Sequence, residues 1–393
     1  MISVEEAKEL IWQNVKPLQV HSVPLSMAAG HLLAADEYAS IDIPAFEQSS
    51  MDGYAIRFED REHPLNIQGE MQAGTTKQFT LLPLHAARIF TGAPLPAGAD
   101  TVVMQEKVQI REGQLIILDT QLSNAVNVRH KGAEAQAGQL AINKGSRLTP
   151  AALGFLAGLG KTHISVHSIP SVAIIATGKE LQSPGQELTF GQVYESNSYA
   201  LSAALKRAYV SEISLYSADD NLEELTAVFQ EALQKHDLVL LTGGVSVGDY
   251  DFVLRAAELL EIEQVFHKVK QKPGKPLYFG KKSDKVIFGL PGNPSSVLSC
   301  FYQYVLPALQ KLTGGTAVCL KVADAVLTHD FRKPAGLTQF VKAQFSEGKV
   351  GALQAQESFR MSSFAQANGM IELPADREEF SAGSTVKVHL FPD

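Results

Sequence analysis

The feature that most constrains the fold is an alternation of strand-like and helix-like runs between about residues 163 and 315. The runs SVAIIATG, EISLYSADD, DLVLLTGG and KVIFGLPG are typical of buried strands, and each is followed by a run with helical character, such as SNSYALSAALKRA or NLEELTAVFQEALQKH. A strand that is repeatedly followed by a helix predicts a parallel α/β sheet with helices on both faces.

Three of these strands end in polar or glycine-bearing turns, at residues 177–180, 242–249 and 290–295. In an open parallel sheet, ligands bind at the carboxyl ends of the strands, and a helix that begins there offers backbone N–H groups to an anion. Asn293 is the predicted cap of the last helix and Pro294 its first residue. We therefore expect an anionic ligand at these turns, with Gly243, Gly244, Ser246 and Asn293 among the binding residues.

Lysines gather in the segment before the last strand. Lys268, Lys270 and Lys272 alternate along a predicted strand, which would place them on one face, and a PGKP turn at residues 273–276 follows. A charged edge strand that resists aggregation is the alternative explanation. We favour anion binding, because glycine lets the backbone approach a phosphate and Lys275 adds charge.

The overall charge makes such a local cluster necessary. The chain has 393 residues, with 34 lysines and arginines against 42 aspartates and glutamates, and its formal net charge is −8. No global positive field would attract nucleic acid or an anionic membrane, so neither is an expected partner.

Carboxylates cluster near the same strand ends, which suggests a hard divalent cation, Mg²⁺, beside the phosphates. Helix capping before Leu222 is an equally good explanation for Asp219 and Asp220, and turn formation beside Gly53 is one for Asp52. The carboxylates of the strand ends are Glu180, Asp219, Asp220, Asp249 and Asp251.

A serine hydrolase is the rival interpretation of one turn. GVSVG matches the G-x-S-x-G nucleophile elbow with Ser246 as nucleophile, and His267, His329 and His389 follow it in the chain. No HGGG-like oxyanion segment is found, and the neighbouring lysines suit a phosphate better than an ester. Labelling of Ser246 by a fluorophosphonate would revive this alternative.

The flanking regions indicate additional parts. Ser3 and Glu6 match a capping box that opens a helix, and the region up to about residue 131 is β-rich, with a hairpin turn at residues 111–113. A short helix is predicted within residues 149–160. Short strands after residue 315 predict a small β domain or barrel.

The sequence also bears on the compartment. Cys300 and Cys319 are the two cysteines, and they form no metal-binding spacing. No signal peptide and no run of about 18 apolar residues is found. We therefore expect a cytoplasmic protein.

Taken in order, the motifs resemble one family. SSMDGYA, RIFTGAPLPAGADTVVMQE, VAIIATGKEL, SNSYAL, LLTGGVSVGDYDFV, KPGKPLYFG and FGLPGNPSSV resemble the molybdopterin molybdenumtransferases, the MoeA and gephyrin E-domain family, over nearly the whole chain. The resemblance implies a homodimer whose chain has a helical part (1–43 and 132–162), a β part (44–131), a MogA-like α/β part (163–315) and a C-terminal β barrel (316–393).

The family's activity implies the ligands. Adenylylated molybdopterin and molybdate would be the substrates, molybdenum cofactor and AMP the products, Mg²⁺ the cofactor and a MogA-like adenylyltransferase a partner. The implied site lies between the α/β part of one subunit and the β part of the other, which would supply Asp52 and Arg129. Lys268, Lys272 and Lys275 would hold pyrophosphate or molybdate oxygens, and Glu180, Asp219 and Asp251 would bind Mg²⁺. The residues carried over are Asp52, Thr91, Arg129, Glu180, Asp219, Asp251, Lys268, Lys272, Pro291, Pro294 and, in the C-terminal part, Ser358.

The chain departs from the family pattern at four positions. Lys179 stands where an aspartate is usual, Lys342 where an arginine is expected, Glu134 within GAEA where GED is usual, and Glu47 in place of a common aspartate. These changes bear on metal geometry and molybdate affinity more than on the fold. They leave a second hypothesis open, a catalytically weakened paralogue that acts as a molybdopterin-binding or scaffold protein.

Overall fold

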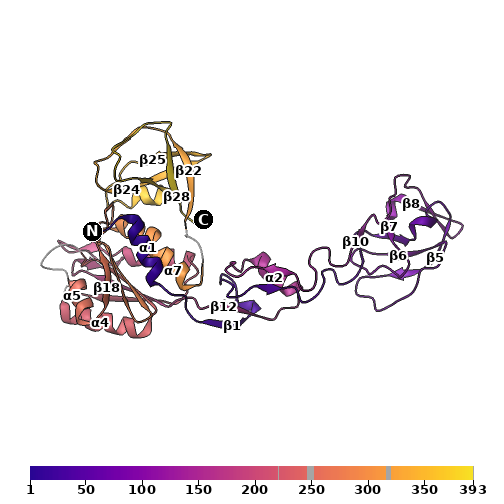
Figure 1. Cartoon of the computed structure of the whole chain (residues 1–393), viewed down its shortest axis with the longest axis horizontal. Coiled ribbons are helices and arrows are strands. Elements are labelled where there is room, and N and C mark those ends of the chain that lie inside the picture. The colour runs from indigo at the N-terminus through magenta and orange to yellow at the C-terminus, as the bar shows by residue number, and fades with distance from the viewer. Residues whose placement is uncertain (220, 246–251, 316–319, 393) are drawn as a thin grey trace. The chain divides into compact units, whose positions relative to one another are not determined.

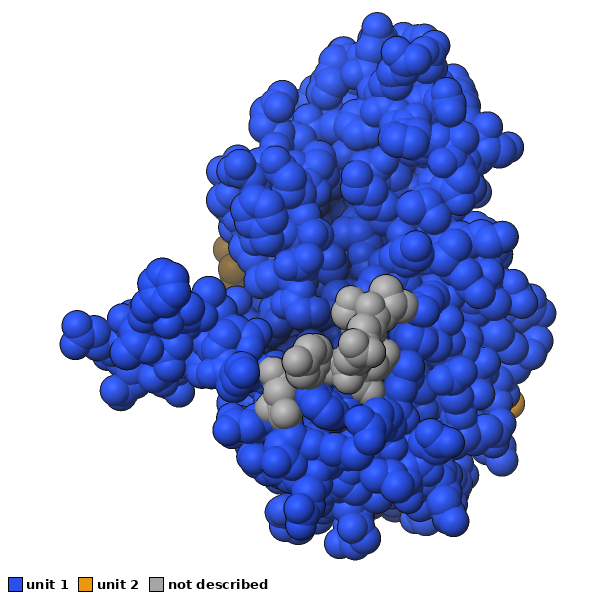
Figure 2. Space-filling model, turned by 90° about the vertical axis from the view of Figure 1, so that its left-hand side faces the viewer, with its two compact units in different colours: residues 1–22, 30–34, 165–393 blue, residues 23–29, 35–164 orange. Residues whose placement is uncertain are grey.

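The computed structural model describes residues 1–219, 221–245, 252–315 and 320–392. The chain divides into two compact units (Figure 1). Unit 1, blue in Figure 2, comprises Met1–Ser22, Gly30–Ala34 and Ser165–Asp393. Unit 2, orange in the same view, comprises Val23–Ala29 and Ala35–Ile164.

A six-stranded sheet forms the centre of the α/β part of unit 1. Four neighbouring strands run parallel, which confirms the predicted α/β fold. Two antiparallel pairings, which the sequence did not reveal, extend one edge and make the sheet mixed. In spatial order the strands are β16 (Ile213–Ala218), β13 (Val172–Thr177), β17 (Leu238–Thr242), β21 (Lys285–Leu290), β20 (Tyr278–Lys282) and β18 (Glu263–His267).

Both faces of this sheet are buried, because alternate side chains of each strand enter different cores. Ile174 and Leu240 pack in the core that contains residues of α1 (Val4–Asn14), α3 (Asn197–Arg207), α6 (Pro294–Cys300) and α7 (Leu306–Leu312). Ile175 and Leu241 pack in the core that contains residues of α4 (Leu222–Lys235) and α5 (Phe252–Leu259). The predicted helices on both faces are therefore confirmed, and a π-helical segment, Phe301–Val305, joins α6 to α7.

Helix α1 begins where the capping box predicts. The Ser3 Oγ accepts a hydrogen bond of 3.0 Å from the Glu6 backbone N–H, which satisfies one of the free donors of the first turn. Ala7 and Ile11 are fully buried and lie in the same core as α7.

The C-terminal part of unit 1 is a closed barrel, as predicted. Its strands are β24 (Thr338–Ser346), β25 (Lys349–Ala352), β22 (Lys321–Leu327), β28 (Thr385–Leu390) and β26 (Gly369–Leu373), and β26 pairs with β24 to close the sheet. Val341, Ile371 and Val388 fill the interior. Strand β19 (Gln271–Lys272) adds to β24 in parallel, so the segment before β20 reaches the barrel.

This arrangement corrects one prediction from the sequence. Lys268, Lys270 and Lys272 do not alternate along one strand, because β18 ends at His267 and β19 contains only Gln271 and Lys272. Lys268 has a φ of 78°, in the left-handed region, which breaks the extended backbone on which a shared face depends.

Unit 2 is built on a second six-stranded sheet, in the order β7 (Thr101–Met104), β4 (Gly53–Ile56), β6 (His85–Ile89), β5 (Leu65–Met71), β9 (Gln114–Ile117) and β8 (Val108–Arg111). The predicted hairpin turn is confirmed between β8 and β9, where Glu112 and Gly113 both have positive φ. The predicted helix is α2 (Pro150–Gly158), and the Thr149 side chain caps it.

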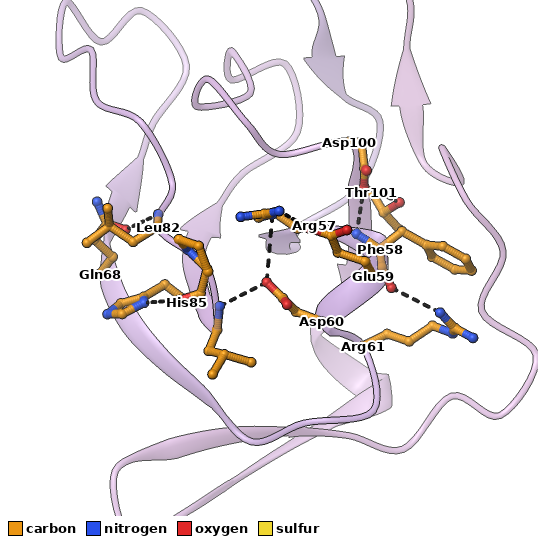
Figure 3. A network of polar contacts seen from close by, with 12 residues as sticks. Arg57, Phe58, Glu59, Asp60, Arg61, Gln68, Leu82, His85, Asp100 and Thr101 are labelled. Atoms are coloured by element: carbon orange, nitrogen blue, oxygen red, sulfur yellow. Dashed lines mark hydrogen bonds and ion pairs between the residues drawn. The ribbon is translucent and has the colours of Figure 1, made fainter.

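A polar network fixes the turn that follows β4 (Figure 3). The Asp60 carboxylate accepts a hydrogen bond of 2.9 Å from the Leu84 backbone N–H and forms an ion pair with Arg57. The Asp100 carboxylate accepts one of 2.8 Å from the Phe58 backbone N–H. These contacts tie the turn to the segments before β6 and β7.

Short elements complete the fold: β1 (Val20–Pro24), β2 (Glu37–Tyr38), β3 (Gln48–Ser49), β10 (Val128–Arg129), β11 (Leu140–Ile142), β12 (His163–His167), β14 (Leu181–Gln182), β15 (Val193–Tyr194), β23 (Phe331–Arg332), β27 (Glu379–Phe380), α8 (Ser362–Gln366) and the 3₁₀ turns Leu25–Met27, Phe58–Asp60 and Gln105–Lys107. Within the described ranges, no helix has the length and apolar character needed to cross a membrane.

Candidate active site

The three predicted turns lie at one rim of the α/β sheet. Strands β13, β17 and β21 are neighbours, and their carboxyl ends are in register: Thr242 pairs with Ala176, the residue before the end of β13, and with Leu290. A Cβ atom added to Gly292 would lie 3.8 Å from the Gly243 Cα. The second and third turns are therefore in close contact.

Glycine is required in the second turn. Gly243 has a φ of +89°, and a Cβ there would lie 2.8 Å from the Thr177 carbonyl oxygen and 2.9 Å from its Oγ1. Gly244 has a φ of +63°, and its Cβ would lie 3.0 Å from a methyl of Val253. Both positions combine a backbone conformation that side chains disfavour with a lack of space.

These turns line a pocket of about 800 Å³. Six of the predicted site residues contribute to it, and Phe359 reaches it from the C-terminal part. The predicted residues in its lining are Glu180, Gly243, Gly244, Pro291, Asn293 and Pro294. We call this the large pocket. The face of unit 1 shown in Figure 2 is hollowed between its upper and lower parts.

Buried polar atoms at the large pocket lack partners. Within the described part of the chain, the Oγ1 of Thr242 and the Oδ1 of Asn197 accept and donate no hydrogen bond, and neither does the Oγ of Ser295 beside the third turn. Thr242 and Ser295 are at most 2% exposed. Buried polar atoms in proteins are nearly always hydrogen-bonded, so these three atoms are exceptions beside the pocket.

Sequence reasoning missed several residues of this pocket. Asn197 donates a 2.9 Å hydrogen bond from its Nδ2 to the Gly292 carbonyl oxygen, which joins the start of α3 to the third turn. Glu195, Tyr194 and Phe359 also line the pocket. The motif SNSYAL contains Asn197, but only the packing of α3 against the sheet shows that it belongs to the site.

Lys268 follows the last residue of β18 at the same rim. His267 pairs with Tyr278 across the sheet, and Tyr278 pairs with Gly289 near the end of β21. The His267 ring nitrogen Nε2 also lies 3.4 Å from the Val245 carbonyl oxygen, next to the second turn. The register therefore brings Lys268 to the rim, although its side chain is not part of the pocket lining.

Lys272 lies elsewhere, in a second pocket of about 450 Å³ between β19 and the C-terminal barrel, which we call the small pocket. Residues 329–331, Gln339 and residues 352–357 line it with Lys272, and they include the carboxylates of Asp330 and Glu357. Two segments contribute to both pockets: 272–276 places Lys272 in the small pocket and Pro276 in the large one, and 352–359 divides in the same way. Lys275 lines neither pocket.

The predicted helix start needs one correction. Asn293 is the N-cap of α6 and Pro294 its first residue, as predicted, but the Asn293 side chain does not cap the helix. Its Nδ2 donates a 2.9 Å hydrogen bond to the Ser358 Oγ, and the Ser295 backbone N–H donates one of 3.1 Å to the Ser358 carbonyl oxygen. The Ser295 N–H is therefore not free for an anion, because Ser358 of the C-terminal part occupies it.

The structure describes two of the three carboxylates that were predicted to bind Mg²⁺, Glu180 and Asp219. Glu180 lines the large pocket, and Asp219 follows β16 at the same rim, since Ala218 pairs with Thr177. Helix capping does not explain Asp219, because the Asn221 side chain caps α4. Asp220, Ser246, Asp249 and Asp251 lie outside the described residues. Within the described ranges, no three or more His, Cys, Asp or Glu side chains form a group that could hold a metal.

Unit 2 brings Asp52 and Thr91 together. The Asp52 carboxylate accepts hydrogen bonds of 2.8 Å from both the backbone N–H and the hydroxyl of Thr91, and these bonds hold the pKa of Asp52 below its usual value. A local turn beside Gly53 therefore does not explain Asp52. Arg129 pairs with Gln48 between β10 and β3, and the Ser50 N–H donates to the Asn127 carbonyl oxygen, so Arg129 belongs to a segment bonded to the same loop.

The four residues that depart from the family pattern lie in different surroundings. Lys179 and Glu134 are exposed, and Lys179 lines neither pocket. Glu47 forms an ion pair of 3.0 Å with His130. Lys342 is buried in the barrel.

For the hydrolase alternative, two candidate histidines are engaged elsewhere. The His389 Nε2 lies 2.5 Å from the Glu372 carboxylate in the barrel, and the His267 Nε2 faces the Val245 carbonyl oxygen. The proposed nucleophile of this alternative, Ser246, lies outside the described residues.

Comparison with known proteins covers the whole chain. Family models match residues 2–160 (MoeA N-terminal region, domains I and II), 173–311 (probable molybdopterin binding domain) and 324–391 (MoeA C-terminal region, domain IV). The chain is 35% identical to a molybdopterin molybdenumtransferase of Staphylococcus epidermidis, over 99% of this chain and 95% of that protein. It is 33% identical to one of Haemophilus influenzae, over 100% and 99%. The crystal structure of a molybdopterin biosynthesis MoeA protein from Pyrococcus horikoshii is similar with a TM-score of 0.83, at 31% identity and with full coverage of both chains.

Proposed function

Because the chain belongs to the MoeA family of molybdopterin molybdenumtransferases, we propose that it inserts molybdate into adenylylated molybdopterin and releases AMP. The chain is thus a transferase of molybdenum cofactor biosynthesis. The observation that supports the reaction most directly is the large pocket at the three strand ends, which the glycine turn of Gly243 and Gly244 lines together with the polar residues Thr242, Asn197 and Glu180. A nucleotide-bearing pterin has the size and the polar groups for such a pocket.

The small pocket is the proposed binding site of the second substrate, molybdate. Lys272 supplies a positive charge there, and the side-chain amide of Gln339 is a potential donor to the oxygens of molybdate. The segments 272–276 and 352–359 form walls of both pockets, so an oxyanion in one pocket would lie beside a ligand in the other. Insertion requires this proximity, because the metal must reach the dithiolene of the bound pterin.

Mg²⁺ is part of the proposal. In proteins it is often bound by one or two carboxylates together with substrate phosphates and water. Glu180 and Asp219, at neighbouring strand ends, fit such a site, and Asp251 lies outside the described residues. When bound, the ion would polarise the phosphoanhydride of the substrate. Glu180 and Asp219 would hold it, and the second turn would position the phosphates.

We further propose a homodimer in the cytoplasm, with a MogA-like adenylyltransferase as the donor of adenylylated molybdopterin. In this dimer, Asp52, Thr91 and Arg129 of one subunit complete the site of the other. The hydrogen bonds from Thr91 to Asp52 support a functional role of this loop, since they hold an exposed carboxylate in a defined position.

The decisive experiment is release of AMP from adenylylated molybdopterin, with and without molybdate, over a Mg²⁺ titration. We expect AMP release that depends on both ions, and formation of molybdenum cofactor in the same reaction. Tight AMP binding without any release would instead indicate a scaffold or binding protein. Release that is independent of molybdate would contradict the proposed transferase reaction.

Mixed dimers test the shared site. At subsaturating molybdate, Asp52→Ala and Lys272→Met homodimers are each expected to release AMP about a hundredfold more slowly than the wild type. Subunits of the two variants, combined by co-expression, should regain about a quarter of the wild-type AMP release, because random pairing places one intact site in half of the dimers. Light scattering after size exclusion establishes the dimer. No recovery in verified mixed dimers would mean that each site is built from one subunit.

A further inference from the structure

Lys342 of β24 is a buried lysine whose ammonium is fully occupied. Only 2% of the residue is exposed, and it lines neither pocket. Its Nζ lies 2.9 Å from the carbonyl oxygen of Ala355, 3.0 Å from that of Arg360 and 3.4 Å from that of Glu357. A lysine ammonium has three N–H donors. These three backbone acceptors therefore leave no donor for an anion.

The segment that Lys342 holds is the common wall of the two pockets. Residues 352–357 line the small pocket, and Phe359 lines the large one. Ser358 lies between them and bonds to Asn293 and Ser295 at the start of α6. Gln356 strengthens the attachment, since its side chain bonds to both the backbone N–H and the carbonyl oxygen of Lys342.

We propose that Lys342 is a positioning residue that holds residues 355–360 against the third turn and does not itself bind the anion. The identity of the ligands rests on the function proposed above, whereas the attachment of the segment does not. Lys342 reaches the site through a chain of contacts: its ammonium fixes the backbone on both sides of Ser358, and Ser358 then joins the barrel to the rim where Asn293 lines the large pocket.

Lys342→Met tests the proposal, because methionine fills similar space but cannot donate hydrogen bonds. We expect hydrogen exchange of the amides in residues 355–360 to rise at least about tenfold, as the local opening free energy of the segment falls. The exchange of the Ser295 amide should rise with it. AMP affinity, measured by calorimetry, should fall by about tenfold, because binding must then order a looser wall at Phe359 and Asn293 of the large pocket. Lys342→Arg should keep both the amide exchange of the segment and the AMP affinity near their wild-type values, because the guanidinium also donates to several carbonyls.

Lys333→Met is the matched control. Lys333 is a second buried lysine of the C-terminal part, and its Nζ donates to the carbonyl oxygens of Leu337 at 3.0 Å and Pro334 at 3.3 Å. None of these three residues lines either pocket. Its loss should loosen residues 334–337 and leave AMP affinity within about twofold. A similar loss of affinity in this variant would mean that any damage to the barrel has the same effect.

Ser358→Ala separates positioning from general stability. It removes the Oγ that accepts from Asn293 and leaves the three carbonyl contacts of Lys342 intact. Because both side chains are proposed to act through one contact, Lys342→Met combined with Ser358→Ala should weaken AMP binding no more than Lys342→Met alone, within about twofold.

Three results would overturn the proposal: unchanged exchange of residues 355–360 in Lys342→Met, additive losses in the double variant, or loss of molybdate binding with normal exchange, which would make Lys342 an anion ligand. Failure of the wild-type protein to bind AMP would count against the proposed function, while the exchange of the segment would still test the attachment.

Discussion

Replacing Gly243 by alanine is expected to abolish turnover. The added Cβ would lie 2.8 Å from the Thr177 carbonyl oxygen and 2.9 Å from its Oγ1, and a φ of +89° is disfavoured for any residue with a side chain. The ends of β13 and β17 must therefore move apart, and Thr242 moves with them. Because a shift of about 1 Å at a reacting centre can cost about hundredfold in rate, we expect AMP release to fall at least about hundredfold.

The control separates backbone strain from the close contact. Gly383, in a turn of the barrel, has a φ of +85°, but nothing lies within 4 Å of the position of its Cβ. Gly383→Ala should lower the unfolding temperature to a similar degree through the same strain and leave AMP release within about twofold. If Gly243→Ala kept more than about a tenth of wild-type turnover, the strand-end rim would not be the reacting region.

Removing the charge of Lys272 is the second large effect we expect. Lys272 is exposed and lines the small pocket, and β19 holds its backbone by pairing with β24. In a protein with a net charge of −8, an oxyanion depends on such local donors. Lys272→Met should lower AMP release at subsaturating molybdate by about a hundredfold, because molybdate loses a charged hydrogen-bond donor and binds more weakly.

The dependence on molybdate identifies the cause. High molybdate should partly restore the rate of Lys272→Met, since the variant loses affinity rather than the reacting groups of the large pocket. Lys349→Met, which removes an exposed lysine of β25 outside both pockets, is the control and should behave as the wild type. A wild-type molybdate dependence in Lys272→Met would remove the small pocket from the proposed reaction.

Much of the α/β part could be predicted because its signals are local. Ile174 and Ile175 enter opposite cores, as an uninterrupted apolar strand requires, and Ser3 caps the helix that its spacing to Glu6 indicates. The glycines after β17 were expected at a ligand, and Gly243 does line the large pocket.

The wrong and missed predictions share a different cause. The lysine alternation failed at Lys268, whose positive φ interrupts the extended backbone between β18 and β19. Asn221, and not Asp219, caps α4. Neighbouring polar residues compete for one cap, and spacing does not decide between them. Asn197 and Phe359 enter the site from segments far from the glycine turns in the chain.

The sequence by itself determined which segments become strands and helices, because periodicity, caps and glycine conformations are set by residues within a few positions of one another. It also determined the family, through motifs that occur in a fixed order. Only the tertiary structure decided how those motifs contact one another. It places three backbone carbonyl oxygens around the Lys342 ammonium, directs the Asn293 side chain to Ser358, and places Lys272 in a second pocket. The physical reason is that such contacts join residues distant in the chain, and their geometry exists only after the sheet and the barrel have packed.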